Sequence, residues 1–329
     1  MSIHFSLLDT SQAAKFSEGI TRVYGDSYPL PEMYDVAYLT DKLADGSLYA
    51  AVACNDLDEV IGTSGALVET PGDRSVDSIA TMVDDRYRGQ KVMAGMGKTI
   101  YQVHHQRNMV GTHLYALAFH DIVQRQSIGG GATPTGVLPA WFGRHARVTG
   151  YQYPDVRRGA VSLYMAIVPA PQRRVYLPGA YAQTLTGIYS GVAVPRTFEQ
   201  APSTANLPAQ GQYETLDHPG NQQRRVIVHQ AGEDLAGLAA AHRQACDEGN
   251  YEVLYMELAL NDAAVEYAVS QARSAGLFYG NLLIERRDTD YLRLQYYPEN
   301  VAAPAAMALY GKQTIALSEF VQADRCAVS

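Results

Sequence analysis

The feature that most constrains the fold of this sequence is an alternation of predicted strands and helices that occurs twice along its 329 residues. Apolar or alternating runs predict the strands, and capped, Pro-free segments predict the helices. In the first half, the predicted strands cover 3–8, 48–53, 60–68, 76–83, 114–118 and 161–168, and the predicted helices cover 13–23, 34–43, 91–107 and 121–127. The order returns later, with strands at 225–229, 253–260 and 291–296 and helices at 235–246 and 262–274. This alternation is typical of α/β domains.

The length of the chain predicts two domains, because a single domain commonly has roughly 100–200 residues. We expect a first domain at 1–169 and a second at 211–329. Between them, 178–191 has a helical pattern, and 195–212 is rich in Pro, Ala, Gln and Ser. These patterns predict a crossover helix and a linker within 170–210.

Charge and composition exclude several classes of protein. The chain has 34 acidic and 26 basic residues and a net charge of −8, whereas a general nucleic-acid binder needs clustered positive charge. With 47% hydrophobic and 18% charged residues, it is not a disordered polymer. No apolar run reaches the roughly 18 residues of a membrane span, and the first residues lack the pattern of a signal peptide. We therefore expect no membrane association and a cytoplasmic location.

The cysteines and histidines do not form a recognisable metal or disulfide pattern. Cys54, Cys246 and Cys326 lie far apart, and no two of them form a CxxC pair. No set of His, Cys and carboxylate residues has the spacing of metal ligands. We therefore expect neither a disulfide framework nor a metal cofactor.

The segment most informative about chemistry runs from Val83 to Met93, between a predicted strand and a predicted helix. At such a junction the first backbone N–H groups of the helix have no partner within it. Together with the helix dipole they form a site suited to a pyrophosphate. Arg88 and Lys91 add positive charge. The alternative is an ordinary basic helix start, whose charges are simply solvated.

This segment resembles the acyl-CoA loop of the GNAT superfamily of N-acyltransferases. The family pattern is Arg/Gln-x-x-Gly-x-Gly/Ala, and it reads here Arg88-Gly89-Gln90-Lys91-Val92-Met93. Lys91 and Met93 stand where the family has small residues, which let a pyrophosphate approach the backbone; Lys91 could instead contact a phosphate directly. The resemblance implies that acetyl-CoA or another acyl-CoA lies on this loop. It also implies that the backbone at Met82 and Val83 polarises the thioester carbonyl.

Two further stretches resemble a long, two-domain branch of the superfamily. The first is Tyr24-Gly25-Asp26-Ser27-Tyr28-Pro29, followed by Gly46-Ser47-Leu48 and Ile61-Gly62-Thr63-Ser64-Gly65-Ala66. The second is His120-Asp121-Ile122-Val123-Gln124-Arg125, which is similar to the branch's His-x-x-Ser-Gln-Lys. The resemblance implies that Tyr24, Tyr28 and Tyr34 line the acceptor cleft and that Gln124 contacts the donor. It also implies an α/β fold of two tandem GNAT-like domains, each with a mixed, mostly antiparallel central sheet flanked by helices.

The second domain resembles a diverged copy of the first. The strand at 253–260 takes the place of the central strand, and Ser274-Ala275-Gly276-Leu277-Phe278 resembles the family's Gly-Phe element. No Arg-Gly loop lies between Glu257 and the helix predicted from Asp262. We therefore expect the second domain not to bind CoA.

The resemblance also implies candidates for proton transfer. Asp77 lies six residues before Val83 with the same strand parity, which is the place of a general base in one GNAT branch. His120 starts the later family element, where it contacts the cofactor, packs the helix start or takes part directly in the chemistry. Ser127 falls where the family has a Tyr that protonates the departing thiolate. For this acid, the alternatives are Tyr115, Tyr164 or a tyrosine near Tyr28.

Three functions follow from these patterns. The first is transfer of an acyl group, most simply acetyl, from acyl-CoA to an amine of a small molecule, amino acid or peptide. The second is a non-catalytic GNAT-fold module that binds an acyl donor or a partner protein. The third keeps the chemistry but takes the acyl group from an acyl carrier protein, whose acidic surface would meet Arg86, Arg88 and Lys91. Two similar domains in one chain can imitate a dimer, so a monomer and a homodimer both remain open.

Overall fold

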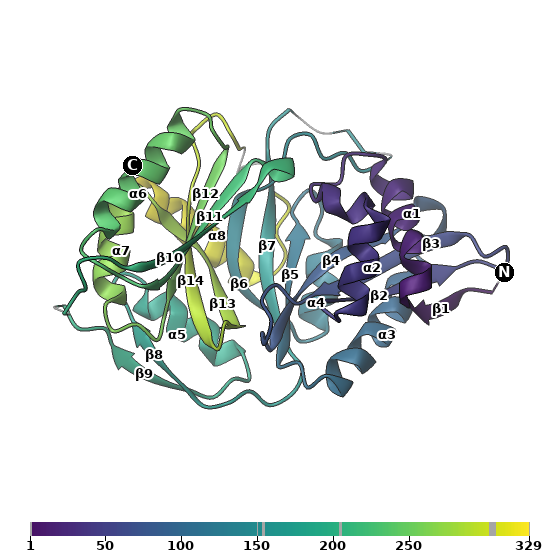
Figure 1. The fold of residues 1–329 in the computed structure, drawn as a ribbon, viewed down its shortest axis with the longest axis horizontal. Helices are drawn as coiled ribbons and strands as arrows, with labels where there is room; N and C mark the ends of the chain where they lie inside the picture. Colours follow the sequence, from purple (N-terminus) through teal and green to yellow (C-terminus); the bar gives the residue numbers. More distant parts are fainter. Residues whose placement is uncertain (1, 150, 153–154, 204–205, 303–306, 329) are drawn as a thin grey trace. The chain divides into compact units, whose positions relative to one another are not determined.

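The computed structural model describes residues 2–149, 151–152, 155–203, 206–302 and 307–328. The chain forms two compact units, which are described separately here (Figure 1). Unit 1 consists of residues 1–114 and 144–155, and unit 2 of residues 115–143 and 156–329. Strand β5 (Gly111–Leu117) runs from unit 1 into unit 2.

Unit 1 is a five-stranded mixed sheet with helices on both faces. Its elements are β1 (His4–Leu7), α1 (Ala13–Tyr24), α2 (Val36–Ala44), β2 (Leu48–Cys54), β3 (Val60–Leu67), β4 (Ser75–Val83), α3 (Val92–Gln106) and the start of β5, with short 3-10 helices η1 (Thr10–Gln12), η2 (Pro31–Tyr34) and η3 (Asp85–Tyr87). The strand order is β1-β2-β3-β4-β5; β4 and β5 are parallel, and the other neighbours are antiparallel.

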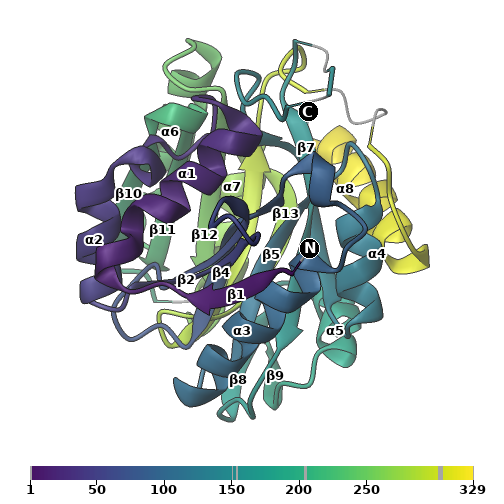
Figure 2. The same cartoon turned by 90° about the vertical axis from the view of Figure 1, so that its right-hand side faces the viewer.

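The two faces of this sheet pack against different helices. In β3, Gly65 lies against Phe16 of α1, whereas Gly62 lies against Met96 and Val92 of α3. Figure 2 shows α1 and α2 on one side of these strands and α3 on the other. Because both faces are covered, β2 is buried along its whole length, which explains its continuous apolar sequence.

Unit 2 has a larger, mostly antiparallel sheet. Its elements are α4 (Ile122–Gly129), β6 (Thr133–Phe142), β7 (Arg158–Ala166), β8 (Arg173–Leu177), α5 (Ala182–Gly191), β9 (Arg196–Gln200), β10 (Gln212–His218), η4 (Pro219–Asn221), β11 (Gln223–Gln230), α6 (Leu235–Asp247), β12 (Val253–Ala259), α7 (Val265–Ser274), β13 (Phe278–Arg286), β14 (Thr289–Tyr296) and α8 (Lys312–Val328). The order of its main strands is β7-β6-β13-β14-β12-β11-β10. Only β11 and β12 are parallel among the pairings described for these strands, and β8 pairs with β9 in a separate parallel ribbon.

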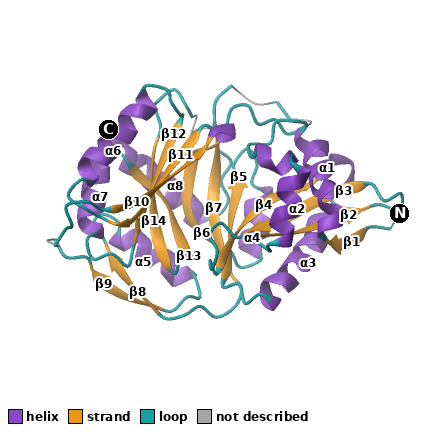
Figure 3. Ribbon diagram, viewed as in Figure 1, coloured by secondary structure: helices purple, strands orange, loops and turns teal. Residues whose placement is uncertain are grey.

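The core of unit 2 lies between this sheet and its helices. Leu254, Met256 and Leu258 of β12 belong to one buried apolar cluster with Leu235 of α6 and Val269 of α7. Figure 3, coloured by secondary structure, shows α6 and α7 beside the strands β10–β12. β12 is buried along its whole length, and only Glu257 interrupts its apolar sequence.

The predicted fold class is confirmed: both units are α/β, with a mixed, mostly antiparallel sheet flanked by helices. The domain boundaries at 169/170 and 210/211 remain predictions. The compact units are not contiguous in sequence, because the connection 144–155 between β6 and β7 packs within unit 1. Among the described helices, none combines the length and the apolar character needed to cross a bilayer.

Candidate active site

The candidate site in unit 1 begins where β4 and β5 stop pairing. The described ladder between these parallel strands contains Ser75, Val76 and Asp77 of β4, but β4 continues to Val83. On the other edge of β4, the N–H of Asp84 donates to the carbonyl of Ile61 in β3 (2.9 Å). Successive N–H groups of a strand point to opposite edges. The N–H of Val83 therefore faces the edge that β5 has left.

A β-bulge lies in β4 just before this open edge. Thr63 pairs with Met82 and Gly65 with Ile79, so β4 contains one more residue than β3 between these pairs. Ala80 in the bulge has a φ of 47°, which residues with a side chain rarely adopt. Its carbonyl accepts a hydrogen bond from Thr63 Oγ1 (2.8 Å), and its N–H donates to Tyr28 Oη (3.0 Å).

The three tyrosines predicted to bind the acceptor lie together at this bulge. Tyr28 N donates to Tyr34 Oη (2.9 Å), and the rings of Tyr24 and Tyr28 meet edge to face with centroids 5.0 Å apart. Burial raises the pKa of Tyr28 to about 12, so its phenol stays protonated at neutral pH. The structure thus brings Tyr24, Tyr28 and Tyr34 to the strand that carries Val83; their role in acceptor binding stays a prediction.

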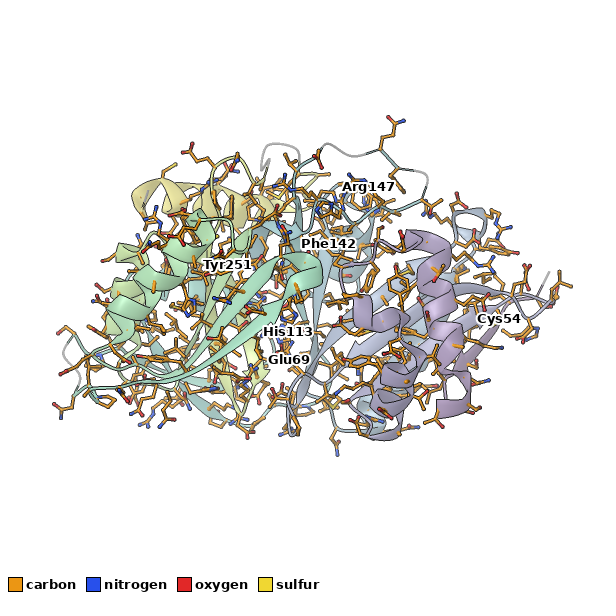
Figure 4. The ribbon with its side chains drawn as sticks, turned by 45° about the horizontal axis from the view of Figure 1, so that its top comes forward. Cys54, Glu69, His113, Phe142, Arg147 and Tyr251 are labelled. Carbon is orange, nitrogen blue, oxygen red and sulfur yellow. The ribbon has the colours of Figure 1, made fainter. Side chains whose placement is uncertain are left out.

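Asp77, the predicted general base, is the last residue of β4 in the ladder with β5. It is half-buried, and its register partner in β5 is the fully buried His113 (labelled in Figure 4). Asp77 therefore lies where β4 and β5 separate, three residues before Ala80. The extra residue of the bulge lies between Asp77 and Val83, so the shared strand parity predicted from their spacing is wrong.

The loop after β4 is organised by Asp84. Its carboxylate caps η3 by accepting from Arg86 N (3.0 Å) and pairs with the guanidinium of Arg86 (Nη2 to Oδ2, 2.6 Å). The hydrogen bond from Arg86 lowers the pKa of Asp84 to about 2. Arg22 of α1 lies 3.6 Å from the same carboxylate. Arg86 is thus engaged in fixing the loop.

The next residues of the loop form an exposed, basic helix start. Arg88, Gly89, Gln90 and Lys91 are all exposed, and Gly89 and Lys91 have φ values of 79° and 62°. Lys91 is the N-cap residue of α3, and no side chain caps this helix. The amides of residues 92–94 have no partner within α3, and at the positive end of the helix dipole they suit a phosphate.

Other predicted loop residues have different surroundings. Val92 is buried in the apolar cluster under α3, and Met93 is half-buried in the first helical turn. The side-chain amide of Gln90 donates to the carbonyl of Arg86 (3.3 Å). Arg88 contacts Tyr151, with its Nη1 3.3 Å from the phenol oxygen and its guanidinium carbon 5.4 Å from the ring centroid.

The remaining predicted residues, His120, Gln124 and Ser127, belong to unit 2. Gln124 in α4 is fully buried; its side chain donates to the carbonyl of Ala308 (2.8 Å) and accepts from Tyr310 N (2.9 Å). A donor contact would have to replace these bonds. Ser127 is half-buried in α4, and the ring of His120 meets that of Phe119 (centroids 4.2 Å apart). Their roles in donor binding and catalysis remain predictions.

Several contacts of the site are not visible in the sequence pattern. Thr63 and Ala80 are 17 residues apart, Arg88 and Tyr151 are 63 apart, and Ser27 and Arg147 are 120 apart. Ser27 Oγ accepts from Arg147 N (2.7 Å), which connects Arg147 to the tyrosine-rich segment, residues 24–38 (Arg147 is labelled in Figure 4). No local pattern reports such contacts, because the fold creates them. Within the described part of the chain, no group of three or more potential metal ligands is found.

Comparison with known proteins places these features in context. No family model matches this sequence, and no curated protein matches it. Among solved structures, the ribosomal-protein-S18-alanine N-acetyltransferase of Escherichia coli is 11% identical, with a TM-score of 0.39 over 52% of this chain and 97% of that chain. An aminoglycoside 6′-N-acetyltransferase complexed with coenzyme A is 15% identical, with a TM-score of 0.37 over 51% of this chain and 99% of that chain.

A third solved structure carries the family's name. An acetyltransferase of the GNAT family from Staphylococcus aureus Mu50 is 13% identical, with a TM-score of 0.35, and covers 51% of this chain and 100% of that chain. Each of these matches spans about half of the chain. The chain is thus similar to these individual solved structures over about half of its length, and to nearly the full length of each of them.

Proposed function

We propose that unit 1 transfers an acyl group, most simply acetyl, from acyl-CoA to an amine of a small molecule, amino acid or peptide. The observation that carries this proposal is the open edge of β4, where the N–H of Val83 faces away from β3 just before the basic start of α3. A thioester carbonyl at this edge would accept a hydrogen bond from Val83. The donor's phosphates would then reach the loop that follows it in the chain.

The chemistry is nucleophilic acyl substitution. The amine nitrogen of the acceptor attacks the thioester carbonyl carbon, an N–C bond forms and the C–S bond breaks. The Val83 amide stabilises the oxyanion that develops on the carbonyl. The ammonium proton of the acceptor leaves to a base, and the CoA thiolate leaves and takes up a proton.

Asp77 is the proposed base, acting directly or through a water. It lies at the end of the β4–β5 ladder, on the strand that carries the Val83 amide. For the acid, a tyrosine near Tyr28 is the candidate within unit 1; Ser127, Tyr115 and Tyr164 belong to unit 2 and remain predictions. At its raised pKa, Tyr28 keeps its proton at neutral pH.

The donor would be held by Arg88, Gly89, Gln90 and Lys91 with the amides at the start of α3. Lys91 keeps the left-handed conformation, φ 62°, at a position where the family has glycine. The backbone of Lys91 thus has a conformation that glycine adopts without steric cost. As the exposed N-cap residue of α3, Lys91 adds a positive charge at the helix start, which suits a phosphate oxygen.

The two alternative functions, acyl transfer from a carrier protein and a non-catalytic binding module, require different properties of this loop. A carrier-protein donor would use Arg86, Arg88 and Lys91 as a basic surface, but Arg86 is paired with Asp84. A non-catalytic module is favoured by Met93 in the first turn of α3, because the family has a small residue there that lets a pyrophosphate approach the backbone.

Calorimetry with acetyl-CoA and longer acyl-CoAs tests the proposal, with Arg88→Glu as the key variant. We expect binding by the wild type and at least a tenfold loss of affinity in the variant, because a charge-assisted contact is replaced by repulsion. Lys98→Glu is the matched control: it makes the same charge change on α3 about two turns further on and should stay within threefold. Absence of binding to every acyl-CoA would overturn the proposal.

A turnover assay distinguishes an acyltransferase from a non-catalytic binding module. Release of free CoA is measured with a panel of small amines, amino acids and peptides. Binding of acyl-CoA with release for at least one amine supports acyl transfer. Binding without release for the whole panel would favour the module.

A further inference from the structure

The geometry points to Tyr28 as a positioning residue for acyl transfer: its hydroxyl holds the β4 bulge and thereby sets the direction of the Val83 amide. This inference rests on the proposed function. It goes beyond acceptor binding, which is the role that the family resemblance implies for Tyr28.

The bulge needs to be held. Ala80 has a left-handed φ of 47°, a conformation that a side chain disfavours and that persists only where the surroundings impose it. Thr63 Oγ1 donates to the Ala80 carbonyl, and Tyr28 Oη accepts from the Ala80 N–H. Thr63 is fully buried and Ala80 is 4% exposed, so water does not readily replace either bond.

Tyr28 is itself fixed in place. Its N–H donates to Tyr34 Oη, and its ring meets the ring of Tyr24 edge to face. The next residue back, Ser27, accepts from Arg147 N and donates to the Arg147 carbonyl (3.0 Å). The hydroxyl of Tyr28 thus belongs to a connected and anchored segment, and it can act as a fixed support for β4.

The bulge controls the register of the residues after it. One extra residue in β4 decides which N–H groups between Ala80 and Asp84 face β3 and which face the open edge. Without the extra residue, the alternating directions of the N–H groups would shift by one residue. The N–H of Val83 would then point toward β3. Tyr28 therefore affects the thioester carbonyl through the backbone, without a contact to the donor's phosphates.

The test uses acetyl-CoA labelled with 13C at the thioester carbonyl. In the wild type, the hydrogen bond from Val83 should shift the bound carbonyl resonance downfield from that of free acetyl-CoA. Tyr28→Phe should bind acetyl-CoA with a Kd within about threefold of the wild type but lose most of this downfield shift. Tyr38→Phe is the matched control, because Tyr38 lies in the same tyrosine-rich segment and contacts Lys42 instead (5.7 Å from Nζ to ring centroid).

A rescue variant separates positioning from general damage to the fold. Glycine adopts the left-handed conformation without steric cost, so Tyr28→Phe combined with Ala80→Gly should recover part of the lost shift. Ala80→Val in an otherwise wild-type chain should instead reproduce the effect of Tyr28→Phe. Where an acceptor is identified, Tyr28→Phe should lower kcat about tenfold or more, with little change in the KM for the donor.

The outcomes are distinct. No binding of acetyl-CoA by the wild type overturns the proposed function. Normal binding with an unchanged downfield shift in Tyr28→Phe overturns this inference and leaves the proposed function intact. A lost shift without any recovery in the glycine variant also overturns it, because the effect then does not act through the conformation of Ala80.

Discussion

At the scale of single residues, Lys91 is the clearest departure from the acyl-CoA loop pattern. It has a φ of 62°, is exposed and directly precedes α3. Two roles are compatible with this position. Either the ammonium group holds a phosphate, or the side chain obstructs the approach that glycine would permit.

Two substitutions distinguish these roles. Lys91→Gly and Lys91→Asn both tolerate the left-handed conformation and both remove the charge. We expect each to change the free energy of unfolding by less than about 1 kcal/mol, with glycine relieving the steric cost of the side chain. Both should weaken acetyl-CoA binding about tenfold, as the loss of a charge-assisted hydrogen bond would. Titration calorimetry and urea denaturation provide the measurements, and tighter binding by Lys91→Gly would show that the lysine obstructs the donor.

The residues of the candidate site differ in how far the sequence predicts them. The loop 88–91 is predictable because its residues are consecutive and directly follow a strand. Tyr24, Tyr28 and Tyr34 were placed near the acceptor through a resemblance, and the structure gathers them at β4. The hydrogen bond from Ala80 N to Tyr28 Oη joins residues that are 52 positions apart in the sequence. Neither an alanine nor a tyrosine predicts this bond by its residue type. For Gln124 the motif predicts a contact with the donor, but in the structure its side-chain amide is hydrogen-bonded to the backbone of Ala308 and Tyr310.

At the scale of secondary-structure elements, the sequence pattern predicts many of those with an apolar face, but it misses β6 and β13, which are buried along most of their length. β2, β3, β4 and α3 coincide closely with the predicted ranges. In contrast, β9 lies in the segment predicted as a linker, because four of its five residues are exposed and it has no apolar alternation. Helix α8 was not predicted; its buried positions include Thr314, Ser318 and Asp324, so hydrophobic periodicity is weak there.

β9 is held by charge. The side chain of Arg196 is fully buried and bonds to Asp290 (Nε to Oδ2, 2.7 Å) and to Glu285 (Nη2 to Oε1, 2.6 Å), which are themselves buried. A buried carboxylate without a partner is strongly destabilising. These buried ion pairs hold β9 in place, although the strand has no apolar face.

Substituting Arg196 tests this account of β9. Arg196→Met keeps much of the side-chain volume but removes the guanidinium from the buried Asp290, whereas Glu285 keeps its pair with Arg173 (2.8 Å). We expect the free energy of unfolding to fall by about 3–5 kcal/mol, as when one partner of a buried ion pair is removed. Arg174→Met on the neighbouring strand β8 is the control: Arg174 is 60% exposed and pairs weakly with Glu199 (3.8 Å), so we expect a change below about 0.5 kcal/mol. A loss of under 1 kcal/mol in Arg196→Met, measured by urea denaturation, would contradict this account.

At the scale of the whole molecule, the two units use their central strands differently. In unit 1, β4 pairs with β5 over three residues and then has an open edge. In unit 2, β12 pairs with β11 over Val253–Leu258 and with β14 over Leu254–Ala259, so its edges are occupied along almost their full length. No comparable open edge is present along β12, which is fully within the described residues.

The connection after β12 is also unsuited to binding an anion, because carboxylates lie at the start of the helix that follows. Asp262 stands between β12 and α7; its carboxylate accepts from Ala264 N (2.9 Å) and from Ala231 N (2.8 Å). Glu266 lies in the first turn of α7 and accepts from Gly179 N (2.6 Å). Carboxylates thus occupy the place where the basic loop of unit 1 has Arg88 and Lys91, and a phosphate would be repelled there.

These differences predict one donor site per chain. Calorimetry with acetyl-CoA should give a stoichiometry of one, and Arg88→Glu should remove the whole signal rather than half of it. Hydrogen exchange supplies a local measurement, because a bound ligand protects the segment that it holds. Acetyl-CoA should slow exchange in 82–95 and leave the equivalent strand–helix junction at 257–268 unchanged. Two molecules bound per chain, or protection at 257–268, would show that the paired edges of β12 and the carboxylates near α7 do not exclude the donor.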